Sequence, residues 1–278
     1  MAASCEHARR TVLAVVAALL LGACGAGEQR RSEALLGRAQ EQIANGRFTP
    51  ALDTLARAAR EAPESESGQR ARVLHLALLG GMARGYRAMA ESYLEGWRAA
   101  GEAPQASRMR AAAMDYFGRA RASSLDMVDA TQALLKAPPA EPVRLDFSLP
   151  ENPPGESETL GRIRQGQPVP DRERLEAEKK EILGGLARTL STLAGTRGEP
   201  ERVARADFYL GAGRELIELS SIYGPEALRN RRMTRLYYRR ALALAERAGE
   251  LAAQAGNNRQ AAESEELQEY CQEALQGS

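Results

Sequence analysis

Apolar residues recur at intervals of three and four through most of the chain beyond about residue 30, with polar residues at the other positions. This spacing is typical of amphipathic helices, and the alternating β-branched runs that would indicate strands are hard to find. Glycine and proline interrupt the pattern at Gly46, Pro63, Gly101–Pro104, Pro200 and Gly224–Pro225. The sequence therefore predicts an all-α chain, with helices near 30–45, 48–61, 68–100, 106–136, 172–195, 200–222, 225–255 and 258–275.

The segment 138–171 differs from the rest because eight of the 13 prolines lie in it, between Pro138 and Pro170. Proline at this density predicts that no helix forms here. Within the segment, Val143–Phe147 alternates apolar and polar residues and predicts a short extended piece. Two interpretations remain open: a loop that completes a binding surface, or a linker between a helical half at 30–137 and a second half at 172–278.

The N-terminus has the order of a secretory leader. Two arginines, Arg9 and Arg10, precede an apolar run from Thr11 to Leu21, and Gly22-Ala23-Cys24 follows. The run is too short to cross a hydrocarbon layer of about 30 Å, which needs about 20 apolar residues. We therefore expect residues 1–23 to be removed from the exported protein.

Leu21-Gly22-Ala23-Cys24 resembles the lipobox of bacterial lipoproteins. The resemblance implies cleavage before Cys24, a covalent lipid on its sulfur and a short tether at 24–29. Position 25 is Gly and not an acidic residue, which in such lipoproteins implies the outer membrane, with the protein facing the periplasm. The alternative is an ordinary signal peptide cut near Ala23, with Cys24 as a free thiol.

The segment Gly46–Pro63 resembles the second half of a tetratricopeptide repeat (TPR). The family's turn glycine, aromatic residue, small and large apolar residues and closing proline stand at Gly46, Phe48, Ala51, Leu55, Ala58 and Pro63. Small residues let paired helices approach closely, a large one fills the space between them, and proline ends the helix.

Weaker echoes of this pattern occur at Ala113, Phe117 and Ala120 and at Thr234, Tyr238 and Ala241, but they do not follow the TPR period of about 34 residues. The resemblance implies a TPR-like array of antiparallel helical hairpins, a degenerate α-solenoid or bundle. The overall layout, with the stretch Met114–Ala122, is also similar to the T-component family of tripartite (TRAP-type) periplasmic transporters, which implies a ligand-related accessory role.

Composition excludes several classes of function. Hydrophobic residues make up 44% and charged residues 27% of the chain, as in globular proteins. The net charge of +1, from 38 basic and 37 acidic residues, is too small to give an overall positive field that would attract nucleic acid. Beyond the leader there is one histidine, His75, and lipidation of Cys24 would leave Cys271 as the single thiol. We therefore expect no metal site and no disulfide.

Motifs for catalysis are missing from the sequence. No lysine follows a glycine, so a phosphate-binding Walker loop is absent. Gly211-Ala-Gly213 lacks the third glycine and the preceding strand of a dinucleotide site. Asp126 and Asp129 lie three residues apart on one helical face, which is more typical of surface charges than of an acid–base pair. We expect no enzymatic activity and no cofactor beyond the lipid.

Two clusters are candidates for binding. Tyr86, Tyr93 and Trp97 follow at intervals of seven and four, along one stripe of a helix, and the simpler alternative is packing against another helix. Six arginines lie within 12 residues and no acidic residue interrupts them: Arg229, Arg231, Arg232, Arg235, Arg239 and Arg240. They are suited to a carboxylate, a phosphate or lipid head groups, or else form a solvated face paired with the acidic segment Glu263–Glu273.

These observations predict a lipid-anchored, non-enzymatic scaffold of the cell envelope that binds partner proteins through its helical repeats. The alternative is a ligand-binding accessory component of a periplasmic solute transporter. The sequence names neither the partner protein nor a small-molecule ligand.

Overall fold

The structure is a computed structural model that describes residues 27–136, 141–151, 157–195, 202–223 and 230–277. The predicted leader 1–23, Cys24 and part of the Pro-rich segment lie outside the described residues. Most described residues are helical and very few are in strands, which confirms the all-α prediction. Within this part of the chain, no helix is both long enough and apolar enough to cross a bilayer.

A helix at residues 27–44 comes first. The later elements are α2 (Phe48–Glu61), α3 (Glu66–Ala100), α4 (Ala106–Lys136), β1 (Val143–Arg144), α5 (Glu158–Arg164), α6 (Asp171–Ala194), β2 (Arg202–Val203), α7 (Arg205–Ser220), the 3-10 turn η1 (Ser221–Tyr223), α8 (Arg231–Gln254) and α9 (Asn258–Gly277). The predictions at 48–61 and 106–136 agree with α2 and α4 at both ends. The other predicted ends differ by a few residues, apart from the helix starts expected at 200 and 225. The start at 225 lies outside the described residues.

Two predictions of secondary structure are wrong. The Pro-rich segment was expected to contain no helix, yet α5 forms at Glu158–Arg164, because the prolines flank these seven residues and none lies within them. The predicted helix 200–222 begins only at Arg205, since Arg202–Val203 is extended and pairs antiparallel with Val143–Arg144. Burial of Val143 and Val203 explains the pairing, and β1 confirms the extended piece expected there.

The first hairpin buries the apolar positions of the Gly46–Pro63 pattern. The four apolar positions at the matched spacing, Phe48, Ala51, Leu55 and Ala58, are all buried. The Ser32 hydroxyl donates a hydrogen bond of 2.9 Å to the Ala58 carbonyl, which joins the first helix to α2. Gly46, with φ of 71°, makes the turn between them.

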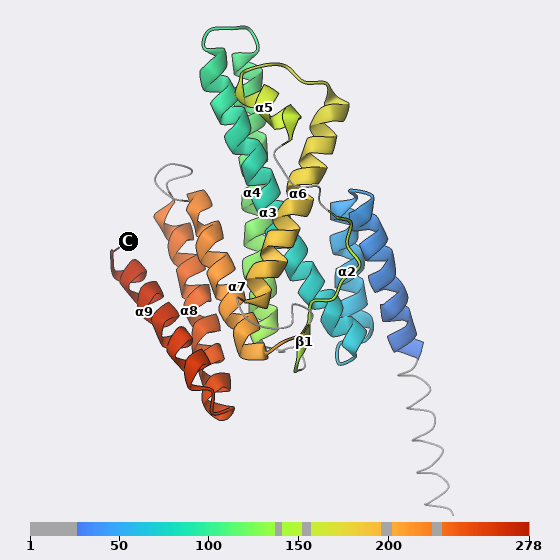
Figure 1. Cartoon of the computed structure of the whole chain (residues 1–278), viewed down its shortest axis with the longest axis vertical. Coiled ribbons are helices and arrows are strands. Elements are labelled where there is room, and N and C mark those ends of the chain that lie inside the picture. Colours follow the sequence, from blue (N-terminus) through green and yellow to red (C-terminus); the bar gives the residue numbers. More distant parts are fainter. Residues whose placement is uncertain (1–26, 137–140, 152–156, 196–201, 224–229, 278) are drawn as a thin grey trace, which may run out of the picture.

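The longest described helix, α3, runs through the centre of the molecule and contacts α2, α4, α5, α6 and α7 (Figure 1). The first two helices lie to one side and α7, α8 and α9 to the other. One hydrophobic core extends from Leu36 to Cys271. In a solenoid each repeat contacts only its neighbours. The contacts of α3 with α6 and α7, distant in sequence, therefore do not confirm the TPR-like array as a whole.

The segment between the two predicted halves is part of this core. Val143, Leu160 and Ile163 are buried in it. The Glu141 carboxylate accepts hydrogen bonds from the Arg205 backbone N–H, at 2.9 and 3.0 Å, and so caps the first turn of α7. The described residues of 138–171 thus contact both the N-terminal and the C-terminal helices.

Three glycines let α3 and α6 cross without side chains between them. A Cβ atom added at Gly81 would lie 2.6 Å from the Leu186 Cα atom, and one added at Gly185 would lie 2.4 Å from the Gly81 carbonyl oxygen. Gly85 stands equally close to the backbone of Ile182. The backbones of α3 and α6 are therefore in direct contact, and this contact fixes how the central helices cross.

Gly81→Ala is expected to lower the free energy of unfolding by about 1 to 3 kcal/mol, because the methyl group would force the two backbones apart. Gly118→Ala is the matched control, since Gly118 is an exposed glycine of α4 with nothing within 4 Å of an added Cβ. It is expected to raise the free energy of unfolding by about 0.5 to 1 kcal/mol. Urea denaturation followed by circular dichroism measures both, and equal changes in the two variants would contradict the close crossing.

Candidate functional site

The predicted aromatic stripe packs inside the molecule. Tyr86 and Tyr93 of α3 are buried, and their rings lie 6.2 and 5.7 Å from the ring of Tyr116 in α4. The Tyr116 hydroxyl donates a hydrogen bond of 2.8 Å to Glu178 of α6. Burial, followed by the nearby Glu178 charge, raises the pKa of Tyr116 above its usual value. The stripe therefore joins α3, α4 and α6, as the packing interpretation expected.

Trp97, at the end of the stripe, is half-buried against the core. The Arg110 guanidinium of α4 stands over its indole ring, 5.2 Å from the ring centroid. This cation–π contact holds the ring against α4. Trp97 thus connects the ends of α3 and α4, and it lies apart from the groove described below.

The arginines of α8 lie on the surface. Four of the predicted cluster are exposed: Arg231, Arg232, Arg235 and Arg239. Arg240 instead donates a hydrogen bond of 3.0 Å to Gln132 of α4. The expected pairing with Glu263–Glu273 is not seen for Arg231, Arg232 or Arg239, which have no described carboxylate within ion-pair distance. Arg229 lies outside the described residues.

The residues considered for metal binding or catalysis lie on two helices, His75 on α3 and Asp126 and Asp129 on α4. His75 is largely buried, and burial lowers the pKa of its imidazole while the Asp53 charge partly opposes the shift. Asp126 and Asp129 are exposed on α4, and partial burial, followed by the charge of Asp129, raises the pKa of Asp126. No group of three or more metal-ligating side chains occurs in the part of the chain that the structure describes.

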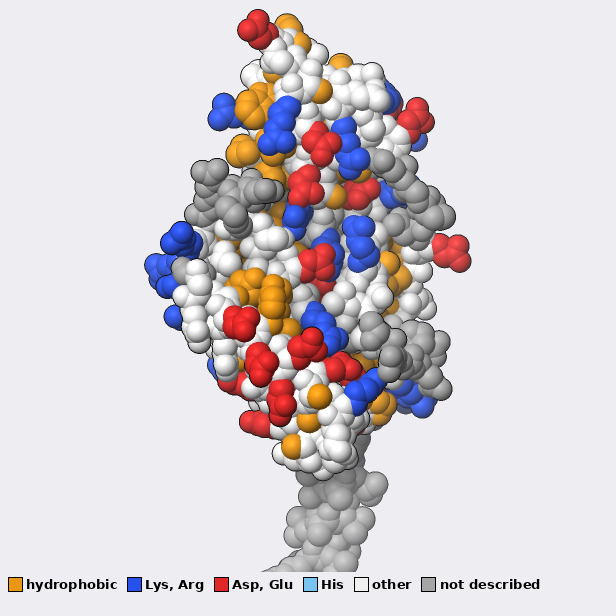
Figure 2. Space-filling view, turned by 60° about the vertical axis from the view of Figure 1, so that its left-hand side comes forward, with side chains coloured by type: hydrophobic (Ala, Val, Ile, Leu, Met, Phe, Trp, Pro, Cys, Tyr) orange, Lys and Arg blue, Asp and Glu red, His pale blue; other side chains and the backbone are white. Residues whose placement is uncertain are grey.

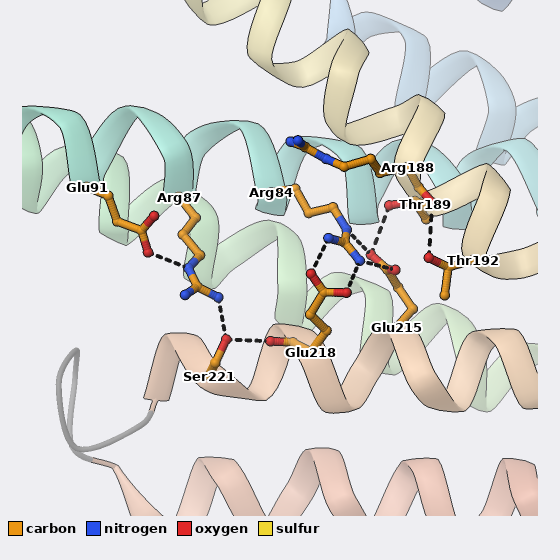
Figure 3. A network of polar contacts seen from close by, with 9 residues as sticks. All are labelled: Arg84, Arg87, Glu91, Arg188, Thr189, Thr192, Glu215, Glu218 and Ser221. Atoms are coloured by element: carbon orange, nitrogen blue, oxygen red, sulfur yellow. Dashed lines mark hydrogen bonds and ion pairs between the residues drawn. The ribbon is translucent and has the colours of Figure 1, made fainter. Parts of the chain in front are cut away.

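A buried ion pair links α3 to α7 and α6 (Figure 3). The Glu215 side chain is fully buried, and its carboxylate accepts hydrogen bonds from Arg84 Nε at 2.7 Å, Arg84 Nη2 at 2.6 Å and the Thr189 hydroxyl at 2.9 Å. Burial acts to lower the pKa of Arg84, but its hydrogen bonds with Glu215 and Glu218 raise that pKa above its usual value. Arg84 therefore remains charged and joins two carboxylates of α7.

The second of these carboxylates, Glu218, lies at the edge of a groove between α7 and α9. We call this the α7/α9 groove; its volume is about 520 Å³, and it is lined by Arg214, Ile217, Glu218, Glu263, Glu266, Leu267 and Tyr270. Tyr270 is 52% exposed, one of four large hydrophobic side chains exposed in the described part of the chain. In Figure 2, the side of the molecule that carries α9 is turned forward, and hydrophobic side chains on this face stand beside a group of acidic ones.

Sequence reasoning missed this groove, although a signal for it existed. Glu263, Glu266, Leu267 and Tyr270 follow at the intervals of one helical face, and Arg214, Ile217 and Glu218 do the same in α7. Each pattern is an ordinary amphipathic stripe. Only the tertiary arrangement shows that the two stripes face a common space which no described side chain fills.

Comparison of the chain with protein-family models, with curated proteins and with solved structures finds no match to any of them.

Arg84→Met is expected to destabilise the fold by about 3 to 5 kcal/mol, because it leaves the buried Glu215 carboxylate without its cation. Adding Glu215→Gln should restore part of this loss, since the amide is neutral and its oxygen still accepts from Thr189. Urea denaturation measures both effects.

Arg87→Met serves as the control, because Arg87 makes only exposed polar contacts, a half-exposed pair with Glu91 on the same helix and a hydrogen bond to the exposed Ser221 hydroxyl. Its expected cost is about 0 to 1 kcal/mol. If Arg84→Met costs no more than Arg87→Met, or if the second substitution worsens the loss, the ion pair does not have the structural role assigned to it.

Proposed function

We propose that this protein is a lipid-anchored, non-enzymatic scaffold of the bacterial cell envelope, which binds a partner protein through its helical surface. The observation that carries the proposal is the α7/α9 groove, where the half-exposed ring of Tyr270 lies beside Ile217 and Leu267. Exposed apolar side chains within a polar rim are typical of protein-binding surfaces. Tyrosine is among the residues that contribute most at such surfaces.

The TPR-like character of the array is part of this proposal. The hairpin formed by the first helix and α2 supports it locally, because Ala51, Leu55 and Ala58 are buried at the matched spacing. At the other end of the chain, α7, α8 and α9 follow one another as neighbouring helices, with contacts from α7 to α8 and from α8 to α9 (Figure 1). In this proposal they present the groove as a rigid surface.

The transporter-accessory alternative has less support. It required a ligand pocket lined by the aromatic stripe, and Tyr86 and Tyr93 are instead packed against Tyr116. The α7/α9 groove is bordered by charged side chains and extends along two helices, a shape better suited to a segment of protein than to a small molecule.

The location rests on the sequence around Cys24, which lies outside the described residues. A lipid on Cys24 would hold the helical body at a membrane, in our proposal the periplasmic face of the outer membrane. Confinement to one surface raises the effective concentration of partners at that surface. This is the advantage that an anchor gives to a scaffold with no chemistry of its own.

Cys24→Ala is expected to abolish incorporation of radioactive palmitate when the full chain is produced in a bacterium, because the acceptor sulfur is removed. Cys271→Ala is the control and should be labelled as strongly as the unmodified protein, since Cys271 is buried in α9. Labelling that persists in Cys24→Ala would show that the anchor assignment is wrong.

Partner binding is tested by cross-linking in cells. Replacement of Tyr270 by the photo-reactive p-benzoylphenylalanine is expected to give a discrete cross-linked product, because this residue lines the proposed binding groove and is half exposed. The same replacement at Met114 in α4 and at Leu175 in α6 provides controls of similar exposure, 50% and 57% against 52% for Tyr270. The same products at all three positions, or none at Tyr270, would contradict a binding surface at the groove.

A further inference from the structure

The floor of the α7/α9 groove is apolar and formed by two helices. Ile217 of α7 is partly buried and Leu267 of α9 is buried, and the Tyr270 ring is half exposed beside them. The Tyr270 ring also contacts Tyr238 of α8, with the ring centroids 6.1 Å apart. This contact orients Tyr270, so its exposed half is a fixed part of the surface.

The rim of the groove carries an excess of carboxylates. Glu218 is paired with Arg84, and Glu263 is paired with Arg214 at 3.1 Å. Glu266 is exposed, and no described cation lies within ion-pair distance of it. The groove thus holds three carboxylates and one guanidinium, Arg214, among its lining residues. A bound segment with positive charges would complement this rim.

The acidic character extends along α9. Its only arginine is Arg259, and its acidic residues are Glu263, Glu265, Glu266, Glu269 and Glu273. The exposed carboxylates beyond the rim add an attraction for cations that falls off over a Debye length of about 10 Å. A segment with negative charges would be repelled by the same side chains.

The shape of the groove matches a helix. The lining residues of α9 stand at positions 263, 266, 267 and 270, and those of α7 at 214, 217 and 218, so the groove runs between two helical stripes. A third helix packs between such stripes by placing its own ridge of side chains in the space. The stretch from Glu263 to Tyr270 rises by about 10 Å, which accommodates about two turns.

We propose that the α7/α9 groove binds a cationic amphipathic helix of a partner protein, with apolar side chains on Ile217, Leu267 and Tyr270 and a lysine or arginine on Glu266. This inference deepens the proposed function, on which it rests, by naming the chemistry of the partner. The recognition is of the helix-in-groove type, in which anchors at positions i, i+3, i+4 and i+7 occupy an apolar groove.

The test uses the purified full chain in detergent and a fluorescent 16-residue peptide with leucines at i, i+3, i+4 and i+7 and lysines on the flanking faces. Fluorescence anisotropy is expected to show saturable binding that weakens as sodium chloride is raised. A peptide of the same composition in scrambled order should bind at least about tenfold more weakly, because it has no apolar face.

Variants of the protein locate the binding. Tyr270→Ala and Glu266→Lys are each expected to raise the Kd about tenfold. Met114→Ala removes an equally exposed apolar side chain elsewhere, and Glu102→Lys makes the same change of charge in the turn between α3 and α4, so neither should alter the Kd. Far-ultraviolet circular dichroism should show the same helix content in all variants, since the substituted positions are exposed.

Three results would overturn the proposal: equal binding of the scrambled peptide, an unchanged Kd for Tyr270→Ala, or a loss with Glu102→Lys as large as with Glu266→Lys. A fourth is a dimer of the unmodified chain, seen by light scattering and lost in Tyr270→Ala, which would place a second copy in the groove.

If the peptide does not bind but cross-linking at Tyr270 still yields a discrete product, the helix chemistry is wrong while the scaffold function stands. Peptide binding without any cross-linked product would contradict the function instead.

Discussion

The direct backbone contact between α3 and α6 determines where the remaining helices lie. Gly81 and Gly85 of α3 and Gly185 of α6 leave no room for side chains at the crossing. Each glycine costs about 1 kcal/mol of helix propensity relative to alanine. That cost is offset by the dispersion contacts of two closely packed backbones. The rest of the architecture is built around this contact, because α3 touches α2, α4, α5 and α7 as well.

The ion pair beside the crossing connects it to the groove. Gly80 precedes Gly81, and an added Cβ there would lie 2.7 Å from the Thr189 side chain and 3.2 Å from Glu215. Arg84 follows one turn later and reaches both Glu215 and Glu218. A buried ion pair adds little net stability over well-packed apolar residues, but loss of one partner leaves the other charge buried at a large cost, so Arg84 and Glu215 keep α3 and α7 in contact. Through Arg84, the packing of α3 on α6 thus sets the position of the Glu218 carboxylate at the rim of the α7/α9 groove.

The sequence predicted those parts of the fold that depend on local pattern. The spacing of Phe48, Ala51 and Leu55 predicted α2 and its buried face, and the stretch at 106–136 predicted α4. Both predictions succeeded because a glycine or a proline lies just outside each end of these helices. The helix α5 was missed because the prolines were counted over the whole segment, although none lies within Glu158–Arg164. The strand at Arg202–Val203 was missed because its partner, Val143–Arg144, is distant in the sequence.

The candidate site was harder to predict from the sequence than the helices, because it is formed by residues that only the tertiary structure brings together. The spacing of Tyr86 and Tyr93 was compatible both with a binding surface and with packing against another helix. The contacts of both rings with Tyr116 of α4 favour packing, and the sequence alone does not reveal them. Leu267 and Tyr270 belong to an equally ordinary stripe, yet one is buried and the other half exposed. Periodicity indicates which face of a helix is apolar. It does not indicate whether a neighbouring helix covers that face.

The net charge of the chain conceals two local excesses of opposite sign. α9 carries five glutamates and one arginine, whereas the first turn of α8 has no acidic residue and begins with Arg231 and Arg232. Cations at a helix N-terminus interact unfavourably with the helix dipole, whereas anions there interact favourably with it. Exposed charges act mainly within a Debye length of about 10 Å. A partner at the groove therefore responds to Glu266 and its neighbours, not to the total of +1, and a cationic helix remains compatible with a nearly neutral chain.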